Sequence, residues 1–316
     1  MQNLTKNDWE KLNEIYQGLQ WTPHSGQSKV LKAVFVDRIK SVFVQCGRKW
    51  GKTDVIEYIL WRWAYTNPGS SCYYISPFNK QSKELIWANR RIQNFGPREW
   101  IKGINNSELR ITLTNDSFIK LDGSDNFDAY RGVEPHLLVM EEYKDHRPEF
   151  MEAMRPNLSV YDAPCVFIGT PPETIDNHFL KDAEEHKEDP TKFFCTGSSW
   201  DNPYIPRDWL EKEKERLYKR GDGDQWEREY EGRFVRGGAN KIFPMLKESF
   251  VKPHQDILDE IARDNSDKIY YWPSYEMVKE YAQNPYTDDN RHVKKSITQE
   301  IMDNFVKYYT TNNIGL

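Results

Sequence analysis

Val42-Phe-Val-Gln-Cys-Gly-Arg-Lys-Trp-Gly-Lys-Thr53 joins a short apolar strand, a glycine-bearing turn and the start of a helix near Lys52. This order of elements makes a phosphate cradle, because N–H groups at a helix start point at an oxyanion and Gly51 lets the backbone approach it. Lys52 adds a positive charge, and the Thr53 hydroxyl is a ligand for Mg²⁺. The stretch therefore predicts a nucleoside triphosphate site that uses magnesium.

The cradle departs from the standard phosphate-binding loop at its start. Gly47 is one residue closer to Gly51 than the standard spacing allows, and Cys46 stands where the first glycine is expected. A helix N-terminus with a surface lysine would show the same short pattern. The rest of the chain has to decide between the two interpretations.

Composition sets broad bounds on the protein. A chain of 316 residues with 38% hydrophobic and 14% aromatic residues can bury a sizeable core. No apolar run reaches membrane-spanning length, and the polar N-terminus has no signal-peptide segment, so we expect a cytoplasmic protein without a membrane partner. The net charge of −5 gives no general attraction to nucleic acid, so DNA contact would need a local basic face.

The four cysteines, Cys46, Cys72, Cys165 and Cys195, show no paired metal spacing, and each lies in or beside an apolar strand. They are predicted to be buried free thiols in a reducing compartment.

Strand and helix signals alternate along the chain. Apolar strands are predicted at residues 71–75, 137–140, 165–168 and 193–196, with helices between them, at residues 80–93 and 147–154 among others. Residues 109–114 and 118–121 alternate about a turn at Asn115-Asp116, which indicates a hairpin. The pattern predicts an α/β fold, with a mainly parallel sheet flanked by helices and an antiparallel edge hairpin.

Two acids end one of these strands. In His136-Leu-Leu-Val-Met-Glu-Glu142 four apolar residues precede Glu141 and Glu142, at the strand end where open α/β sheets bind ligands. A metal at Glu141 and a water-activating role for Glu142 would explain both acids. Two solvated acids at a strand end are the alternative. Thr170, after the strand 165–168, would lie beside the same site.

Gln27 begins the helix that precedes the cradle. A side-chain amide donates and accepts at once, which suits the N6 and N7 edge of adenine. A solvent-exposed glutamine in a first helical turn is the alternative.

Together these elements resemble the ATPase domain of tailed-bacteriophage terminase large subunits, the DNA-packaging motors. The resemblance runs from about Trp21 to Pro244. The matching stretches, besides the shortened cradle and the acid pair, are Tyr74-Ile-Ser-Pro77, Tyr130-Arg-Gly132, Ile168-Gly-Thr-Pro171, Asn202-Pro203 and Tyr230-Glu-Gly-Arg-Phe234. In that family the loop deviates from the standard form in this same way and carries an arginine where Arg48 stands.

The resemblance implies a RecA-like P-loop NTPase and gives its residues roles. ATP would bind along the loop residues Cys46, Gly47, Arg48, Lys49, Trp50, Gly51, Lys52 and Thr53. Thr53 and Glu141, which replaces the usual aspartate, would hold Mg²⁺ or its water.

The remaining roles concern catalysis and the base. Lys52, Arg48 and Glu142 would be catalytic, with Arg48 on the γ-phosphate and Glu142 orienting the attacking water. Gln27 would contact adenine, and Thr170 would sense hydrolysis and couple it to movement.

The resemblance also implies partners: double-stranded DNA, a portal protein, a small terminase subunit and further copies of this chain in a ring, in the bacterial host cytoplasm. Residues 1–40 would form an N-terminal helical segment on the adenine side, residues 41–244 the ATPase core and residues 245–316 a short extension. That extension is too short for a complete nuclease domain, so we expect no nuclease activity from this chain. Cleavage would then require a separately encoded nuclease, or this chain is a truncated or split product. A superfamily-2-like helicase and a nucleotide-binding structural or adaptor protein are the alternatives.

Overall fold

The computed structural model describes residues 19, 21–125, 130–174, 176–235, 299 and 303. The chain divides into two compact units, residues 1–241 and 242–316. All helices and strands named below lie in the first unit. Most of the first half of the expected N-terminal segment, residues 1–18 and 20, and nearly all of the extension after residue 244 lie outside the described residues. The expected divisions at residues 40 and 244 stay predictions.

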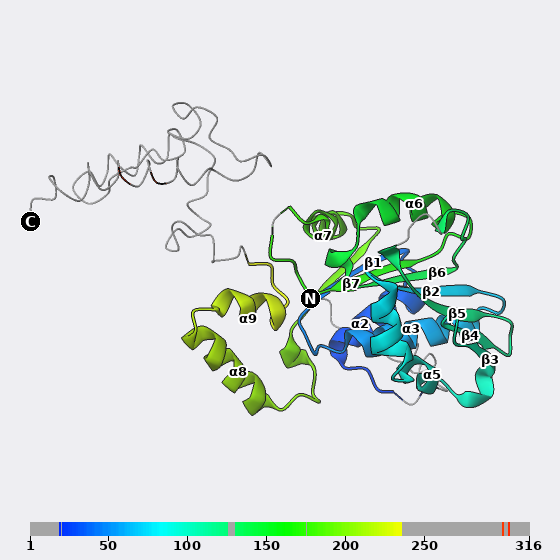
Figure 1. Ribbon diagram of the computed structural model, residues 1–316, viewed down its shortest axis with the longest axis horizontal. Coiled ribbons are helices and arrows are strands. Elements are labelled where there is room, and N and C mark those ends of the chain that lie inside the picture. Colours follow the sequence, from blue (N-terminus) through cyan, green and yellow to red (C-terminus); the bar gives the residue numbers. More distant parts are fainter. Residues whose placement is uncertain are drawn as a thin grey trace, which may run out of the picture. The chain divides into compact units, whose positions relative to one another are not determined.

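An eight-stranded sheet runs through the first unit in the order β3-β4-β5-β2-β6-β7-β1-β8 (Figure 1). Its strands are β1 (Ser41–Cys46), β2 (Ser71–Ser76), β3 (Ile101–Asn105), β4 (Arg110–Leu113), β5 (Phe118–Gly123), β6 (Leu137–Glu141), β7 (Cys165–Gly169) and β8 (Phe193–Gly197). The six neighbouring strands β5, β2, β6, β7, β1 and β8 pair in parallel. Strand β4 is antiparallel to both β3 and β5. The predicted fold class and its edge hairpin are confirmed.

Helices cover both faces of this sheet. In Figure 1, α2, α3 and α5 lie on one face and α6 and α7 on the other. The helices and single turns are α2 (Ser25–Leu31), η1 (Lys32–Val36), α3 (Lys52–Thr66), α4 (Asn79–Gln81), η2 (Ser82–Trp87), α5 (Arg91–Phe95), η3 (Arg98–Trp100), η5 (Tyr143–Asp145), α6 (Pro148–Leu158), α7 (His178–Glu188), η6 (Ser199–Asp201), α8 (Arg207–Lys219) and α9 (Gly223–Glu229).

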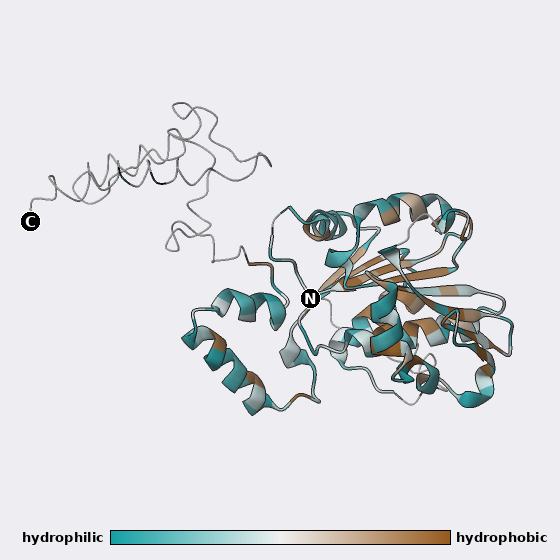
Figure 2. Ribbon diagram, in the orientation of Figure 1, coloured by the Kyte–Doolittle hydropathy of each residue, from teal (hydrophilic) through white to brown (hydrophobic). Residues whose placement is uncertain are grey.

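The alternation of side chains along β1 divides the core in two. Val42 and Val44 point to the cluster that contains the α3 side chains, while Phe43 points to the cluster with Phe150 and Phe179. Figure 2 shows the strands as the most hydrophobic part of the fold. A central parallel strand buried on both faces requires such a continuous apolar run.

One local prediction was wrong, and one strand was missed. The helix expected at residues 80–93 forms as α4, η2 and α5, and the left-handed conformation of Arg90, with φ of 52°, separates η2 from α5. Strand β3 was not predicted, since most of its residues are exposed and Gly103 interrupts any apolar alternation.

The cysteines of the described part of the chain are free, with Cys46, Cys72 and Cys165 buried and Cys195 half-buried. Among the described helices, none has the length and apolar character needed to cross a membrane.

Candidate active site

The predicted cradle is the turn between β1 and α3. Lys49 and Gly51 take positive φ values of 61° and 100°, and Gly51 is the residue that caps α3. Glycine adopts this conformation without the steric cost of a side chain. The cap makes no side-chain hydrogen bond to the first turn of the 15-residue helix. The N–H groups of that turn therefore remain suited to an anionic ligand.

Packing holds the back of the cradle in place. The Gly47 N–H donates to the Gly197 carbonyl over 2.9 Å, and a Cβ on Gly47 would lie 2.3 Å from the Tyr230 carbonyl oxygen. The Ser199 hydroxyl donates to the Arg48 carbonyl, and the Asn202 amide donates to the Lys49 carbonyl, both over 2.6 Å. The segments 197–202 and 230–232 thus fix the loop from behind.

The two predicted acids lie at the same sheet edge as the cradle. The Thr53 hydroxyl donates to Glu141 Oε1 over 3.1 Å, and Lys52 Nζ lies 4.0 Å from Glu142 Oε1. The Tyr74 hydroxyl donates to the other Glu141 oxygen, a contact that the sequence did not reveal. Glu142 itself adopts a left-handed conformation with φ of 50°. Sheet topology therefore brings Lys52, Thr53, Glu141 and Glu142 together.

Burial changes the chemistry of Glu141. Desolvation, with a smaller contribution from the Glu142 charge, raises its pKa from 4.5 to about 7, against the opposing effects of Lys52 and the Thr53 hydrogen bond. A carboxyl of this kind is ready to lose its proton when a cation binds beside it.

The donor set suits Mg²⁺. Thr53 and Glu141 offer neighbouring hydroxyl and carboxylate oxygens, the hard ligands that Mg²⁺ prefers, and Mg²⁺ completes its octahedral shell with water and substrate phosphates. Within the described residues no group of three His, Cys, Asp or Glu side chains could hold a metal without such help. The residues present fit magnesium bound together with a nucleotide.

The other cradle residues divide by exposure. The side chains of Arg48 and Lys49 are exposed, whereas Cys46, Gly47 and Trp50 are buried. Burial raises the pKa of the Cys46 thiol to about 12, so this cysteine stays protonated. Trp50 donates from its indole to Asp201 over 3.2 Å. The buried residues shape the loop through contacts with the rest of the protein, whereas the side chains of Arg48 and Lys49 face solvent.

Arg48 pairs with an acid from another part of the chain. Its guanidinium donates to Glu229 at the end of α9, whose carboxylate also lies 3.4 Å from Arg228. Glu229 is buried, although Arg48 is 65% exposed. Arg48 therefore links the cradle to α9 in this structure.

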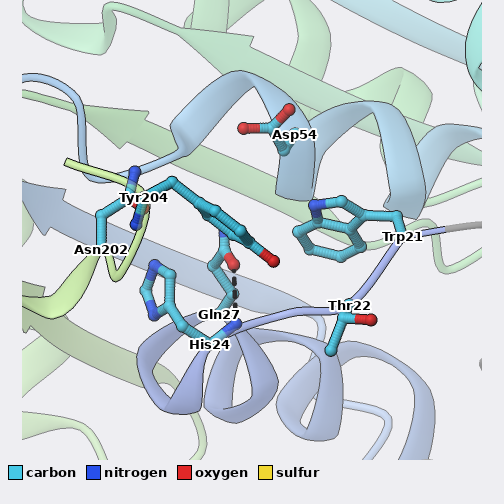
Figure 3. A pocket seen from close by; sticks show the side chains of 7 residues that line it. All are labelled: Trp21, Thr22, His24, Gln27, Asp54, Asn202 and Tyr204. Atoms are coloured by element: carbon cyan, nitrogen blue, oxygen red, sulfur yellow. Dashed lines mark hydrogen bonds between the residues drawn. The ribbon is translucent and has the colours of Figure 1, made fainter.

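Gln27 is buried and contacts the cradle. Its Nε2 donates to the Gly51 carbonyl over 2.9 Å, and its Oε1 accepts from the His24 N–H over 3.0 Å. Beside it lies a pocket of about 340 Å³. Figure 3 shows the seven lining residues, Trp21, Thr22, His24, Gln27, Asp54, Asn202 and Tyr204. The rings of Trp21 and Tyr204 were not singled out from the sequence, and Tyr204 is 76% exposed.

Thr170 is buried just after β7. Its hydroxyl accepts from Lys144 Nζ over 3.1 Å. The preceding Gly169 packs closely on the acid pair, since a Cβ there would lie 3.5 Å from the Glu142 Cα atom. Thr170 thus stands next to the site, and Lys144 is a polar neighbour that sequence patterns did not indicate.

Solved structures share this arrangement of elements. The Thermus phage P74-26 large terminase ATPase domain superimposes with a TM-score of 0.56 at 19% identity, over 74% of this chain and 100% of that one. The chain has the fold of a phage large-terminase ATPase domain. The HK97 bacteriophage large terminase superimposes with a TM-score of 0.62 at 12% identity, over 72% of this chain and 55% of that one.

The large terminase of a thermophilic bacteriophage, in complex with ATP-gamma-S, superimposes with a TM-score of 0.55 at 16% identity, over 67% of this chain and 53% of that one. This chain thus spans about half the length of that protein and of the HK97 large terminase. A GSCFA family model matches residues 252–305, of which the structure describes residues 299 and 303. No curated protein sequence matches the chain.

Proposed function

We propose that this chain is the ATP-hydrolysing motor subunit of a viral terminase, which moves double-stranded DNA into a procapsid. The observation that carries the proposal is the hydrogen bond between Thr53 and Glu141, with Lys52 4.0 Å from Glu142. P-loop ATPases need a lysine, a metal-binding hydroxyl and an acid around one triphosphate. The likeness of the fold to phage large-terminase ATPase domains supports the motor part of the proposal.

The residues divide the work of phosphoryl transfer. The N–H groups of the first turn of α3 and the Lys52 ammonium would bind the phosphates and stabilise their negative charge. Thr53 and Glu141 would hold Mg²⁺, which when bound neutralises charge on the β- and γ-phosphates. Glu142 is 37% exposed and would accept a hydrogen bond from a water positioned in line with the γ-phosphate.

Three further residues would adapt the site to a motor. Arg48 would leave Glu229 to contact the γ-phosphate. Nucleotide binding would then break the ion pair between the cradle and α9. Gln27 would recognise adenine with its second N–H and its second lone pair, because contacts with the described residues use only one of each. Thr170, bonded to Lys144 beside the acid pair, would sense hydrolysis.

The proposed activity requires an assembly. The partners would be double-stranded DNA, a portal protein, a small terminase subunit and other copies of this chain in a ring, within the bacterial host cytoplasm.

The decisive experiment replaces Glu142 with Gln. ATP turnover should fall at least about 100-fold, because the variant cannot accept a proton from water, while the affinity for ATP changes little. Glu149→Gln, which alters an exposed acid on α6, is the matched control and should keep full activity. Undiminished hydrolysis by Glu142→Gln would end the assignment. ATP binding without turnover in the wild-type chain would favour an adaptor protein instead.

A further inference from the structure

His146 is a buried histidine that the roles above leave unused. It follows the turn η5 after the acid pair and is 4% exposed. Its Nε2 atom lies 2.8 Å from the Glu141 carbonyl oxygen, and its Nδ1 atom lies 2.7 Å from the Ser124 hydroxyl. Ser124 is itself buried just after β5. The ring therefore bridges the strand end that carries the acids and a neighbouring loop.

The directions of these two hydrogen bonds follow from the groups involved. A carbonyl oxygen only accepts, so Nε2 must carry a proton and donate to Glu141. Burial lowers the pKa of His146 to about 4, so the ring is neutral at neutral pH and has no second proton. Nδ1 then accepts from the Ser124 hydroxyl. Both ring nitrogens are satisfied without a ligand.

The Glu141 carbonyl that accepts this hydrogen bond constrains the backbone conformation of Glu142. It belongs to the peptide group that joins Glu141 to Glu142, so its direction is tied to the φ angle of Glu142. Glu142 adopts φ 50° and ψ 49°, which a residue with a side chain takes only when its surroundings impose it. Fixing the orientation of this peptide group therefore fixes the direction in which the Glu142 side chain extends from the backbone.

We propose that His146 is a positioning residue, whose hydrogen bond to the Glu141 carbonyl sets the left-handed turn that aims Glu142 at the attacking water. This inference rests on the proposed ATPase function. Ser124 acts through the ring, since its hydroxyl fixes the rotation of His146 from the opposite side. No sequence pattern marks the pair, because Ser124 and His146 are distant in the chain and belong to no motif.

The chain offers a matched control in His186. This histidine is 6% exposed and also bonds one hydroxyl, that of Ser41 at 2.7 Å, and one carbonyl, that of Asp182 at 2.6 Å. It belongs to α7, and its ring contacts Ser41 at the start of β1, the end of that strand opposite to the cradle. Removing its ring therefore costs similar contacts without touching the acid pair.

The experiment measures ATP turnover by the full chain with Mg²⁺ for His146→Ala, His146→Gln, Ser124→Ala and His186→Ala. A small displacement of a catalytic group costs up to about 100-fold in rate, so we expect kcat of His146→Ala to fall about 10- to 100-fold with KM within about threefold. His146→Gln can still donate to the Glu141 carbonyl and should recover at least half of that loss on a logarithmic scale. Ser124→Ala should show a smaller loss in kcat, and His186→Ala should match the wild type.

The outcomes separate the two claims. Wild-type kcat in His146→Ala, with an active wild-type chain, overturns the positioning role and leaves the ATPase proposal intact. Equal losses of kcat in His146→Ala, His146→Gln and His186→Ala also overturn it, because they indicate general destabilisation. A wild-type chain without turnover overturns both. Should His146→Ala not fold, His146→Gln and Ser124→Ala decide: a loss of kcat confined to Ser124→Ala supports the role, and wild-type kcat in both overturns it.

Discussion

The Thr53 hydroxyl donates a 3.1 Å hydrogen bond to Glu141 Oε1, although the two residues are 88 positions apart in the sequence. The contact crosses from the start of α3 to the end of β6, so it exists only when both elements end at the same sheet edge. Its two oxygens are the ones we assign to Mg²⁺. Removing either group should therefore weaken nucleotide binding that depends on the metal.

Thr53→Ala is expected to lower the affinity for ATP with Mg²⁺ about tenfold or more, because a ligand oxygen and a hydrogen bond to an acid are lost. Thr53→Ser keeps the hydroxyl and should bind nearly as well as the wild type. Calorimetric titration with and without Mg²⁺ measures the effect. Thr66→Ala, at the exposed end of the same helix, is the control. Equal affinity of Thr53→Ala and the wild type would contradict the metal assignment.

The raised pKa of Glu141 predicts a pH-dependent stability. The unfolded chain ionises this group near pH 4.5, whereas the folded chain does so near pH 7. The unfolded state therefore binds fewer protons than the folded state between pH 4.5 and about 7. The contribution of Glu141 makes the free energy of unfolding fall as pH rises through this window, and above about pH 7 the free energy stays at the lower value. Urea denaturation of Glu141→Gln should show a shallower fall, while exposed Glu108→Gln should follow the wild type. Identical slopes for Glu141→Gln and the wild type would refute this.

Gly47→Ala tests the packing behind the cradle. The added Cβ would meet the Tyr230 carbonyl oxygen at 2.3 Å, and backbone cannot move away as a flexible side chain can. We expect a loss of about 1–3 kcal/mol in the free energy of unfolding and weaker nucleotide binding. Thermal unfolding and ATP titration measure both. Gly103→Ala has open space around its Cβ and should change neither.

Arg48→Ala removes one of the two arginine partners of the buried Glu229 carboxylate. We expect the free energy of unfolding to fall by about 1–2 kcal/mol, more than for a surface pair and less than for a fully buried one. Arg233→Ala is the control, since Arg233 is about equally exposed, at 67%, but pairs with the more accessible Glu227. It should cost about 0–1 kcal/mol. Equal losses in the two variants, measured by urea denaturation, would show that the burial of Glu229 is unimportant.

Gln27→Ala examines recognition of the base. If the second N–H and the second lone pair of Gln27 contact adenine, Gln27→Ala should lower the preference for ATP over GTP about tenfold. Competition binding of the two nucleotides measures this preference. Exposed Gln81→Ala should keep the preference. If Gln27→Ala weakens the binding of ATP and of GTP equally, Gln27 positions Gly51 and does not recognise the base.

The sheet and the meeting of cradle and acids were predictable for a geometric reason. Parallel strands present their carboxyl ends at one edge, so the end of β1 and the end of β6 had to share it once both were identified. Apolar runs such as the one before Glu141 are strong signals because both faces of a central strand are buried.

The contacts that complete the site depend on packing between distant segments. Tyr74 reaches Glu141 because β2 pairs with β6, and Arg48 reaches Glu229 because α9 returns to the cradle. Nothing in the local sequence marks either partner. The exposed strand β3 and the break at Arg90 escaped for a different reason, since neither leaves a hydrophobic pattern.

The backing of the cradle by residues 230–232 has a practical consequence for dissecting the protein. A Cβ on Gly232 would come within 2.5 Å of the Gly197 carbonyl oxygen and 2.8 Å of the Gly47 nitrogen, so the chain here runs directly against the nucleotide loop. Any shortened version that stops before Tyr230 would strip away this support. A shortened fragment that keeps the cradle intact must therefore extend past Gly232, even though α8 and α9 have highly charged sequences.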